Sequence, residues 1–305
     1  MIKTQVIMRP VFNRPEMLYL SLEAEQVARE YYNIPDTNFL NLFIVEYGAD
    51  EKVKELVESF GGEKEIIYRE ARYGLSKNIL EGMKYSFNKA DDYLIYIEDD
   101  VLVHKTYFQF MDVLMNSDIK PYSFLSPYSQ KDRGSINDVS ATNHYAALAP
   151  LINKPFFNKY IAHCADDLFY QHPQKFIIEL DKSYGVYGKG LYKYKGNHIH
   201  YQQAGLINRL TDIARIKENI QAYAPTVNRQ QHIGMYGYNR IKGDDLSGGS
   251  FEERVSSLRK IINDVDSMNS FTGDKRYLDY TTFDERLDEW DGTIDIRSIE
   301  YNKEG

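Results

Sequence analysis

Residues 93–100 read YLIYIEDD, an uninterrupted apolar run that ends in three adjacent acids. An apolar run without polar alternation is typical of a central strand in a parallel sheet, which is buried on both faces. In open parallel sheets, ligands bind beyond the carboxyl ends of the strands. The sequence therefore predicts that Glu98, Asp99 and Asp100 lie at a ligand-binding edge.

The residues before this stretch alternate between strand-like and helix-like segments. We expect three further strands, at Lys3–Met8, Asn38–Glu46 and Glu65–Arg69. Apolar residues at helical spacing predict helices between these strands, over 16–32, 50–60 and 75–88. Such alternation predicts an α/β fold with a Rossmann-like, mostly parallel sheet and helices on both faces.

The second half of the chain is more mixed. A helix is expected at Tyr107–Met115, a polar loop over 129–143, and helices near 212–222 and 251–265. Residues 279–305 carry nine acids against three bases and are predicted to form a loosely packed tail. We accordingly predict a catalytic domain over 1–205 and a mainly helical extension with an acidic tail over 206–305.

Composition limits the class of protein. The 305 residues have ordinary hydrophobic and charged fractions, 43% and 27%, which exclude disordered and fibrous classes. A single cysteine, Cys164, excludes an internal disulfide framework. No secretory signal and no apolar run near 18 residues are visible, so we expect a cytoplasmic protein without a membrane span.

Three adjacent carboxylates after a buried strand need compensating charge. A divalent cation such as Mn²⁺ or Mg²⁺ provides it and leaves coordination positions for phosphate oxygens. The simpler alternative is that Asp99 and Asp100 only cap the turn into the next helix.

Two further groups of residues are candidates for chemistry. Asp166 and Asp167 stand at a predicted helix start, where they are either first-turn acids or a general base for an acceptor hydroxyl. His198 and His200 share one face of a short strand and could ligate the metal or bind phosphate, or could simply be packed or solvated. Arg72, with Arg69, could reach phosphate or sugar oxygens, or be a surface residue that caps a helix.

Residues 182–243 form a basic, tyrosine-rich segment. They contain ten basic residues against two acidic ones, and eight tyrosines, although the whole chain has a net charge of −8. Such a segment suits a polyanion or a diphosphate, and equally suits a solvated face.

Several segments, in their order along the chain, resemble the GT-A glycosyltransferases, and most closely the alpha-mannoside beta-1,2-N-acetylglucosaminyltransferase I family. The resemblance covers about Lys3 to Tyr201. It is carried by YLIYIEDDVLVHKTYFQF, FLSPYSQKDRG, YAALAPLINKPFFNKY, CADDLF and SYGVYGKG. The family's flanking tryptophans are replaced by Ala165 and Leu168, and nothing after Leu206 is matched.

The resemblance implies a role for each candidate residue. Asp100 would bind Mn²⁺ or Mg²⁺, while Glu98 and Asp99 would contact the ribose and the donor sugar. Asp167, or else Asp166, would be the base of an inverting displacement. The remaining donor-binding residues would be Glu46 at the uracil base, Arg9 in the nucleotide pocket, and Lys189 in a loop that closes over the donor.

We therefore hypothesise a metal-dependent hexosyl- or pentosyltransferase that uses a nucleotide-sugar donor, most simply a UDP-sugar. Its acceptor is either a glycan or a hydroxymethylated DNA base, which residues 182–243 would bind. The alternative is a non-catalytic nucleotide- or cation-binding module. No Gly-rich loop follows the first strand, which argues against a dinucleotide fold, a P-loop and a sugar-phosphate nucleotidyltransferase.

Overall fold

A long mixed sheet organises the fold. The computed structural model describes residues 5–33, 39–117, 124–125, 134–142, 149–162, 167–183, 211, 222–234, 248–263 and 283–297. In chain order the elements are β1 (Gln5–Val11), α1 (Pro15–Tyr31), β2 (Phe39–Val45), α2 (Glu51–Ser59), β3 (Lys64–Tyr68), α3 (Leu75–Lys89), β4 (Tyr93–Tyr96), β5 (Val101–Val103), α4 (Tyr107–Met115), β6 (Phe124–Leu125), β7 (Asp138–Thr142), β8 (Leu151–Asn153), α5 (Lys154–Phe156), a π-helical turn (Phe157–Ile161), α6 (Asp167–Gln171), α7 (Pro173–Ser183), β9 (Ala222–Pro225), β10 (Gln230–His232), α9 (Phe251–Ile262), a 3-10 helix (Glu285–Glu289) and β11 (Asp295–Arg297).

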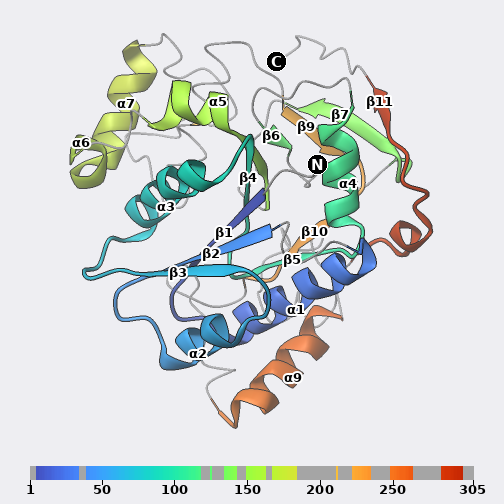
Figure 1. Cartoon of the computed structure of the whole chain (residues 1–305), viewed down its shortest axis with the longest axis horizontal. Helices are drawn as coiled ribbons and strands as arrows, with labels where there is room; N and C mark the ends of the chain where they lie inside the picture. Colours follow the sequence, from blue (N-terminus) through green and yellow to red (C-terminus); the bar gives the residue numbers. More distant parts are fainter. Residues whose placement is uncertain are drawn as a thin grey trace, which may run out of the picture.

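The predicted α/β class is confirmed. Within the described residues, nine strands form one sheet in the order β11-β7-β9-β6-β8-β4-β1-β2-β3, and β10 and β5 form a second pair. β3, β2, β1 and β4 are parallel neighbours, and the antiparallel β8 follows β4. Figure 1 shows this parallel part at the centre of the molecule.

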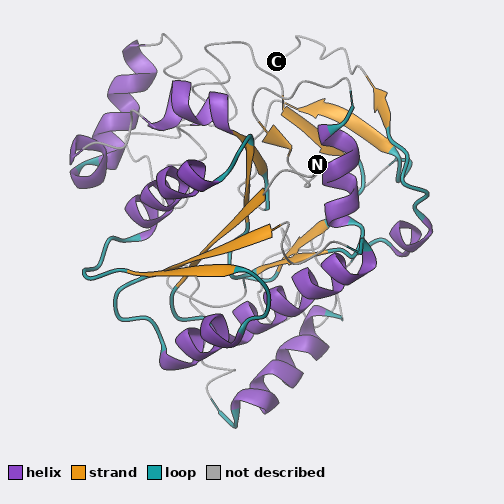
Figure 2. Ribbon diagram, viewed as in Figure 1, coloured by secondary structure: helices purple, strands orange, loops and turns teal. Residues whose placement is uncertain are grey.

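Helices cover both faces of the parallel part, as the apolar strands predict. Val6 and Met8 on one face of β1 pack in a cluster with α3, while Ile7 on the other face packs with α4. α1 and α2 close over β2 through Phe43 and Val45. Figure 2 shows α3 and the helices α1 and α2 on opposite sides of these strands.

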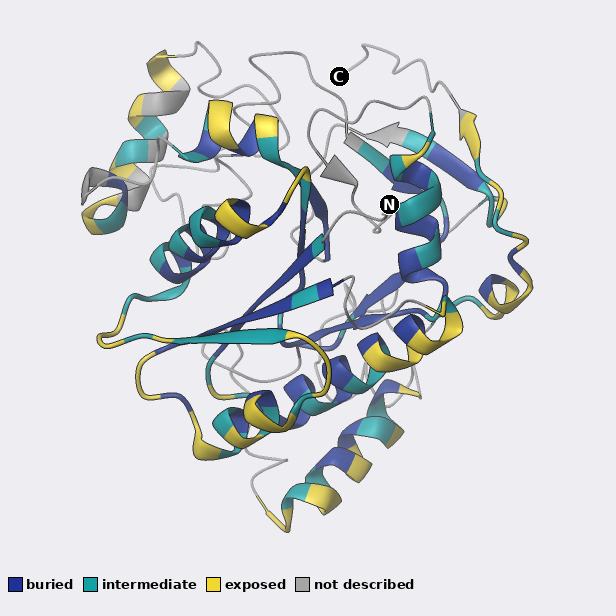
Figure 3. Ribbon diagram, in the orientation of Figure 1, coloured by how far each residue is buried: buried dark blue, intermediate teal, exposed yellow. Residues whose placement is uncertain are grey.

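The central strands β1, β2 and β4 are the most buried elements of the main sheet. β2 and β4 have only one half-buried residue each, Leu40 and Tyr93. Figure 3 shows the central strands buried, with exposure on the outer sides of the helices, in the loops and on the strand β11. Each large apolar side chain removed from water in this way contributes about 1.5–3 kcal/mol, so packing on the sheet dominates the stability of these helices.

Two predictions about irregular segments are wrong. Part of the expected polar loop over 129–143 is the strand β7, whose Val139 is fully buried. In the expected loose tail, residues 283–297 form the 3-10 helix and β11, which pairs with β7. Trp290 is 5% exposed and packs on Phe110, because it completes the apolar cluster around α4.

The described residues after 206 contribute both strands and a helix. β9 and β11 belong to the main sheet, and β10 pairs with β5. α9 begins at a capping box formed by Ser250 and Glu253, and it lies against α1 through the ion pair of Arg254 with Glu16. The domain boundary near residue 206 stays a prediction. Among the helices described, none has the length and apolar character required to cross a membrane.

Candidate active site

The carboxyl ends of the parallel strands bring together residues that follow β1, β2 and β4. β1 lies between β2 and β4 in continuous register, so Arg14, Glu46 and Glu98 leave the sheet at the same edge. The Ile97 N–H donates to the Met8 carbonyl at 3.0 Å, which carries the pairing up to the first acid. This edge is the place where the sequence predicts a ligand.

The three acids form a tight turn between β4 and β5. The Val101 N–H closes it with a 3.3 Å hydrogen bond to the Glu98 carbonyl. Asp99 and Asp100 are 4% and 2% exposed, and Glu98 is half-buried. Carboxylates this buried require cations or hydrogen-bond donors around them.

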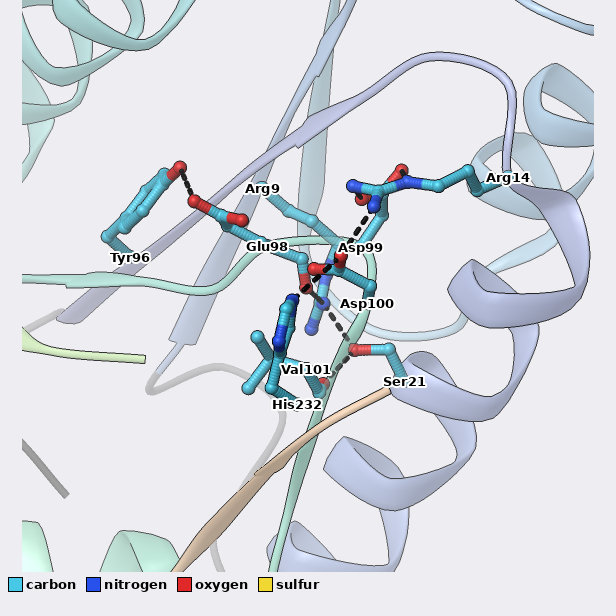
Figure 4. A network of polar contacts seen from close by, with 9 residues as sticks. All are labelled: Arg9, Arg14, Ser21, Tyr96, Glu98, Asp99, Asp100, Val101 and His232. Carbon is cyan, nitrogen blue, oxygen red and sulfur yellow. Dashed lines mark hydrogen bonds and ion pairs between the residues drawn. The ribbon is translucent and has the colours of Figure 1, made fainter. Parts of the chain in front are cut away.

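A guanidinium group provides the first cation. Arg14 occupies the N-cap position of α1, directly before Pro15, and its side chain is not used for capping. Its Nη2 pairs with Asp99 Oδ1, its Nη1 pairs with Asp100 Oδ2, and its Nε lies 3.3 Å from Asp99 Oδ2. Arg14 thus bridges the two aspartates from the loop after β1 (Figure 4).

A histidine approaches Asp100 from a distant part of the chain. β10 pairs antiparallel with β5, and the register places His232 opposite Val101. The Ile233 N–H donates to the Asp100 carbonyl at 2.8 Å and fixes the approach. His232 Nε2 consequently lies 3.1 Å from Asp100 Oδ2.

The environment separates the three acids by their pKa values. Burial, reinforced by the charge of Asp100, raises the pKa of Glu98 to about 7, although Tyr96 donates a 2.8 Å hydrogen bond to it. Burial also raises the pKa of Asp99 against the opposing charge of Arg14. For Asp100 burial acts in the same direction, but Arg14 and His232 outweigh it and lower the pKa below its usual range. Asp100 is therefore ionised at neutral pH.

The surroundings of Asp100 and His232 fit a cation. Asp100 Oδ1 is buried and has no hydrogen-bond partner among the described residues. A Cβ on Gly234 would come within 2.5 Å of Asp100 Oδ2 and 2.6 Å of His232 Nε2, so the absent side chain keeps this space open. One carboxylate and one imidazole suit Mn²⁺ or Mg²⁺ whose other positions are taken by water and phosphate oxygens. No cluster of three or more potential protein ligands is found in the described parts of the chain.

A second polar network connects the acidic turn to α1. Arg9, on β1, donates to Ser21 Oγ at 2.6 Å, to the Glu98 carbonyl at 3.1 Å and to Glu25 Oε2 at 2.6 Å. Arg29 also pairs with Glu25, at 2.7 Å. We call Arg9, Ser21, Glu25 and Arg29 the inner network, and Arg14, Glu98, Asp99, Asp100 and His232 the outer network. The described contacts of Arg9 support the turn, and its contact with a donor stays a prediction.

Glu46 ties two loops together at the same edge. Its Oε1 accepts from the N–H groups of Tyr47 and Tyr73, at 2.9 and 3.0 Å, and its Oε2 accepts from the Gly74 N–H at 3.0 Å. A carboxylate has about four acceptor positions. Among the described contacts, Oε2 therefore keeps one position for a further donor.

The arginines after β3 point in different directions. Arg69 Nε donates to Asn78 Oδ1 at 2.8 Å, and its guanidinium lies 4.6 Å from the centre of the Tyr73 ring. Arg72 is exposed and lies 5.7 Å from the centre of the Phe12 ring, above the loop that leads to Arg14. Arg72 is therefore accessible to a ligand at this edge.

The remaining predicted site residues are only partly placed. Asp167 begins α6, which docks beside α3 through the buried Phe169 and the Tyr170 hydroxyl bond to Glu81. The side chain of Asp167 lies outside the described residues, as do Asp166, Lys189, His198 and His200. In the basic segment, Arg229 is fully buried, 4.0 Å from the centre of the Phe110 ring, and so does not belong to an exposed binding face.

Sequence reasoning missed Arg14, His232 and Gly234 as members of this site. Arg14 has a local signal, since the dipeptide Arg-Pro follows a strand and opens a helix. His232 and Gly234 lie more than 130 residues from the turn, and β10 is only three residues long. Its pairing with β5 cannot be read from apolar periodicity.

Comparison with known proteins yields distant structural likenesses. No protein-family model and no curated protein matches the chain. The mannosyltransferase PcManGT from Pyrobaculum calidifontis, in complex with GDP-Man and Mn²⁺, has a TM-score of 0.41 at 10% identity over 59% of this chain and 53% of that one. A fragment of S. aureus TarS has 0.44 at 8% identity, over 88% and 81%. GalNAc-T7 with UDP, GalNAc and Mn²⁺ has 0.45 at 13% identity, over 88% and 50%. The chain thus spans about half the length of the first and third of these.

Proposed function

We propose that the chain is a metal-dependent glycosyltransferase of the GT-A type, which transfers a sugar from a nucleotide-sugar donor to an acceptor hydroxyl. The observation that carries this proposal is the outer network. Three carboxylates at the ligand-binding edge of a parallel sheet are opposed by one guanidinium, and the ionised Asp100 keeps a buried oxygen without a partner among the described residues. Among the residues that the structure describes, the site is thus short of positive charge.

Asp100 and His232 are the residues that would hold the metal in this proposal. A bound Mn²⁺ or Mg²⁺ would neutralise the charge that develops on the leaving diphosphate. His232 is a further candidate ligand beside His198 and His200, because its Nε2 lies 3.1 Å from Asp100 Oδ2. His198 and His200 remain candidates for phosphate contacts.

The donor is held by residues at the ends of β2, β3 and β4. Glu98 and Asp99 contact the ribose and the sugar, and Arg72, Lys189 and the surroundings of Arg9 complete the donor site. The free acceptor position on Glu46 Oε2 suits a ring N–H of a pyrimidine, which favours a UDP-sugar.

The reaction is an inverting single displacement. The acceptor oxygen forms a bond to the anomeric carbon while the bond from that carbon to the diphosphate oxygen breaks. Asp167, or Asp166, accepts the proton of the acceptor hydroxyl. The acceptor is a glycan or a hydroxymethylated DNA base, and a steep fall of DNA affinity with added salt would select the second.

A non-catalytic module is the second candidate, and the Arg14 bridge favours it. A guanidinium that already pairs with Asp99 and Asp100 lets the turn serve as a structural anchor that binds no donor. Turnover of a donor distinguishes this candidate from a transferase.

The test is titration calorimetry of UDP and GDP, with and without Mn²⁺, on the wild type and on Asp100→Asn. Metal-dependent UDP binding that is lost in the variant, together with release of UDP from a UDP-sugar, is the expected result. Absence of nucleotide binding under every condition would reject the transferase, and undiminished turnover in EDTA would remove the metal from it.

A further inference from the structure

We propose that Arg14 is a displaceable internal cation: it occupies the acidic turn in the metal-free protein and leaves it when a divalent cation binds together with a nucleotide diphosphate. The inference rests on the proposed function. It adds a residue that makes binding of the metal and binding of the diphosphate depend on each other.

The first argument is that Arg14 and a metal require the same atom. Arg14 Nη1 and His232 Nε2 both contact Asp100 Oδ2, the latter at 3.1 Å. A cation held by Asp100 and His232 would stand next to this guanidinium, and the two positive charges would repel each other in a buried site. Arg14 must therefore withdraw from Asp100 before the cation is well bound.

The second argument is that Arg14 is free to withdraw. Its side chain is 24% exposed, whereas that of Arg9 is 1% exposed. Its main chain is anchored, because its carbonyl accepts from the Leu18 N–H at 2.9 Å and Pro15 restricts its conformation. The side chain can therefore swing outward while α1 stays in place.

The third argument is that a diphosphate offers Arg14 a replacement partner. A guanidinium pairs with phosphate oxygens through the same two-pronged geometry that it uses here with two carboxylates. Metal and diphosphate would then bind cooperatively, since the metal takes Asp100 and the diphosphate takes Arg14. Such coupling is reciprocal for the two ligands.

The test is titration of Mn²⁺ alone, without nucleotide, into the wild type and Arg14→Gln. We expect Arg14→Gln to bind Mn²⁺ about tenfold more tightly, since one unit of competing charge has been removed. Arg259→Gln is the matched control: it loses the same charge from an exposed ion pair with Glu23, outside both networks, and its Mn²⁺ affinity should stay within about twofold of the wild type. UDP should tighten Mn²⁺ binding more in the wild type than in Arg14→Gln.

A thermal readout covers the case in which Arg14→Gln folds poorly without metal. Mn²⁺ should raise the Tm of Arg14→Gln by more than that of the wild type, because the ion replaces the missing cation. Arg14→Lys, which keeps the charge but loses the fork, should bind Mn²⁺ only about threefold more tightly than the wild type.

The outcomes separate this inference from the proposed function. Equal or weaker Mn²⁺ binding in Arg14→Gln, with binding abolished in Asp100→Asn, would overturn the role of Arg14 and leave the metal site standing. No Mn²⁺ binding in any variant, even with UDP present, would overturn both.

Discussion

The inner and outer networks lie on either side of one turn and have opposite charge balances. In the inner network Glu25 is shared by two arginines, Arg9 and Arg29, and all three side chains are at most 5% exposed. In the outer network Arg14 faces three carboxylates and is partly open to water. Among the described residues, the inner network is buried and has two arginines for one carboxylate, whereas the outer one has one arginine for three carboxylates.

The difference shows how charge balance separates a structural ion network from a binding site. A buried network that lacks a partner is costly unless a ligand supplies it. In the inner network Arg9 also donates to Ser21 and to the Glu98 carbonyl, and only its Nε lacks a partner among the described residues. The outer network keeps a carboxylate oxygen, Asp100 Oδ1, without a described partner, and the missing side chain of Gly234 leaves space beside Asp100, so it is the network suited to a cation. Variants that change each balance test this distinction.

The largest effect on stability is expected from Glu25→Gln. This variant leaves Arg9 and Arg29 buried without a carboxylate, which should lower the free energy of unfolding by about 3–5 kcal/mol. Urea unfolding measures the loss. Glu30→Gln, on the exposed side of the same helix, is the control and should change stability by no more than about 0.5 kcal/mol. Similar values for the two variants would contradict a buried inner network.

Asp100→Asn should affect binding rather than folding. Loss of the ionised oxygen should weaken Mn²⁺-dependent UDP binding about 100-fold or more, since a ligating carboxylate has been removed. Arg14 keeps its ion pair with Asp99, so the free energy of unfolding in urea should fall by less than in Glu25→Gln. Calorimetry and urea unfolding on the same preparation separate the two effects. Unfolding as severe as that of Glu25→Gln would make the outer network structural.

The pH dependence of stability should reveal the excess of negative charge in the outer network. Burial and the charge of Asp100 raise the pKa of Glu98 from 4.5 to about 7. Between these values the folded state holds a proton that the unfolded state releases, so stability falls as the pH rises from about 4.5 to 7. For this half-buried side chain the fall should be about 1–2 kcal/mol.

Glu98→Gln should remove that part of the pH dependence. The measurement is urea unfolding at several pH values, compared between wild type, Glu98→Gln and the control Glu30→Gln. Parallel curves for the wild type and Glu98→Gln would show that Glu98 titrates alike in the folded and unfolded states.

The smallest effect on stability is expected from Ser21→Ala, at the residue that connects the two networks. Ser21 accepts from Arg9 Nη1 and donates to the Val101 carbonyl, directly after the acidic turn. Ser21→Ala should lower the free energy of unfolding by about 1 kcal/mol, because Arg9 keeps its bonds to Glu25 and to the Glu98 carbonyl. Ser59→Ala, at the exposed end of α2, serves as its control. Equal urea midpoints for the two variants would mean that Ser21 does not link the networks.

Local patterns predicted most of the first half of the fold. The apolar run before Glu98 and the helical spacing of 16–32 and 75–88 correspond to β4, α1 and α3 within a few residues. These elements bury whole faces against the sheet, so each leaves a strong periodic signal. The predicted helix at Tyr107–Met115 is α4 to the residue.

Short strands and distant pairings left no such signal. β5 and β10 are three residues each, and β7 and β11 lie in polar sequence. Trp290 is buried because it packs against two distant residues. Its ring centre lies 5.9 Å from that of Phe110 and 4.6 Å from the guanidinium carbon of Arg229. The burial of such residues depends on partners more than 60 residues away, which no local window contains.

The sequence by itself therefore determined that three acids follow a buried strand, because hydrophobic periodicity is a local property of the chain. Only the tertiary structure decided which cation meets them. Arg14 reaches Asp99 and Asp100 because β1 and β4 are parallel neighbours, and His232 reaches Asp100 because β10 pairs with β5. Charge compensation acts through space between side chains, and strand order rather than residue spacing sets those distances.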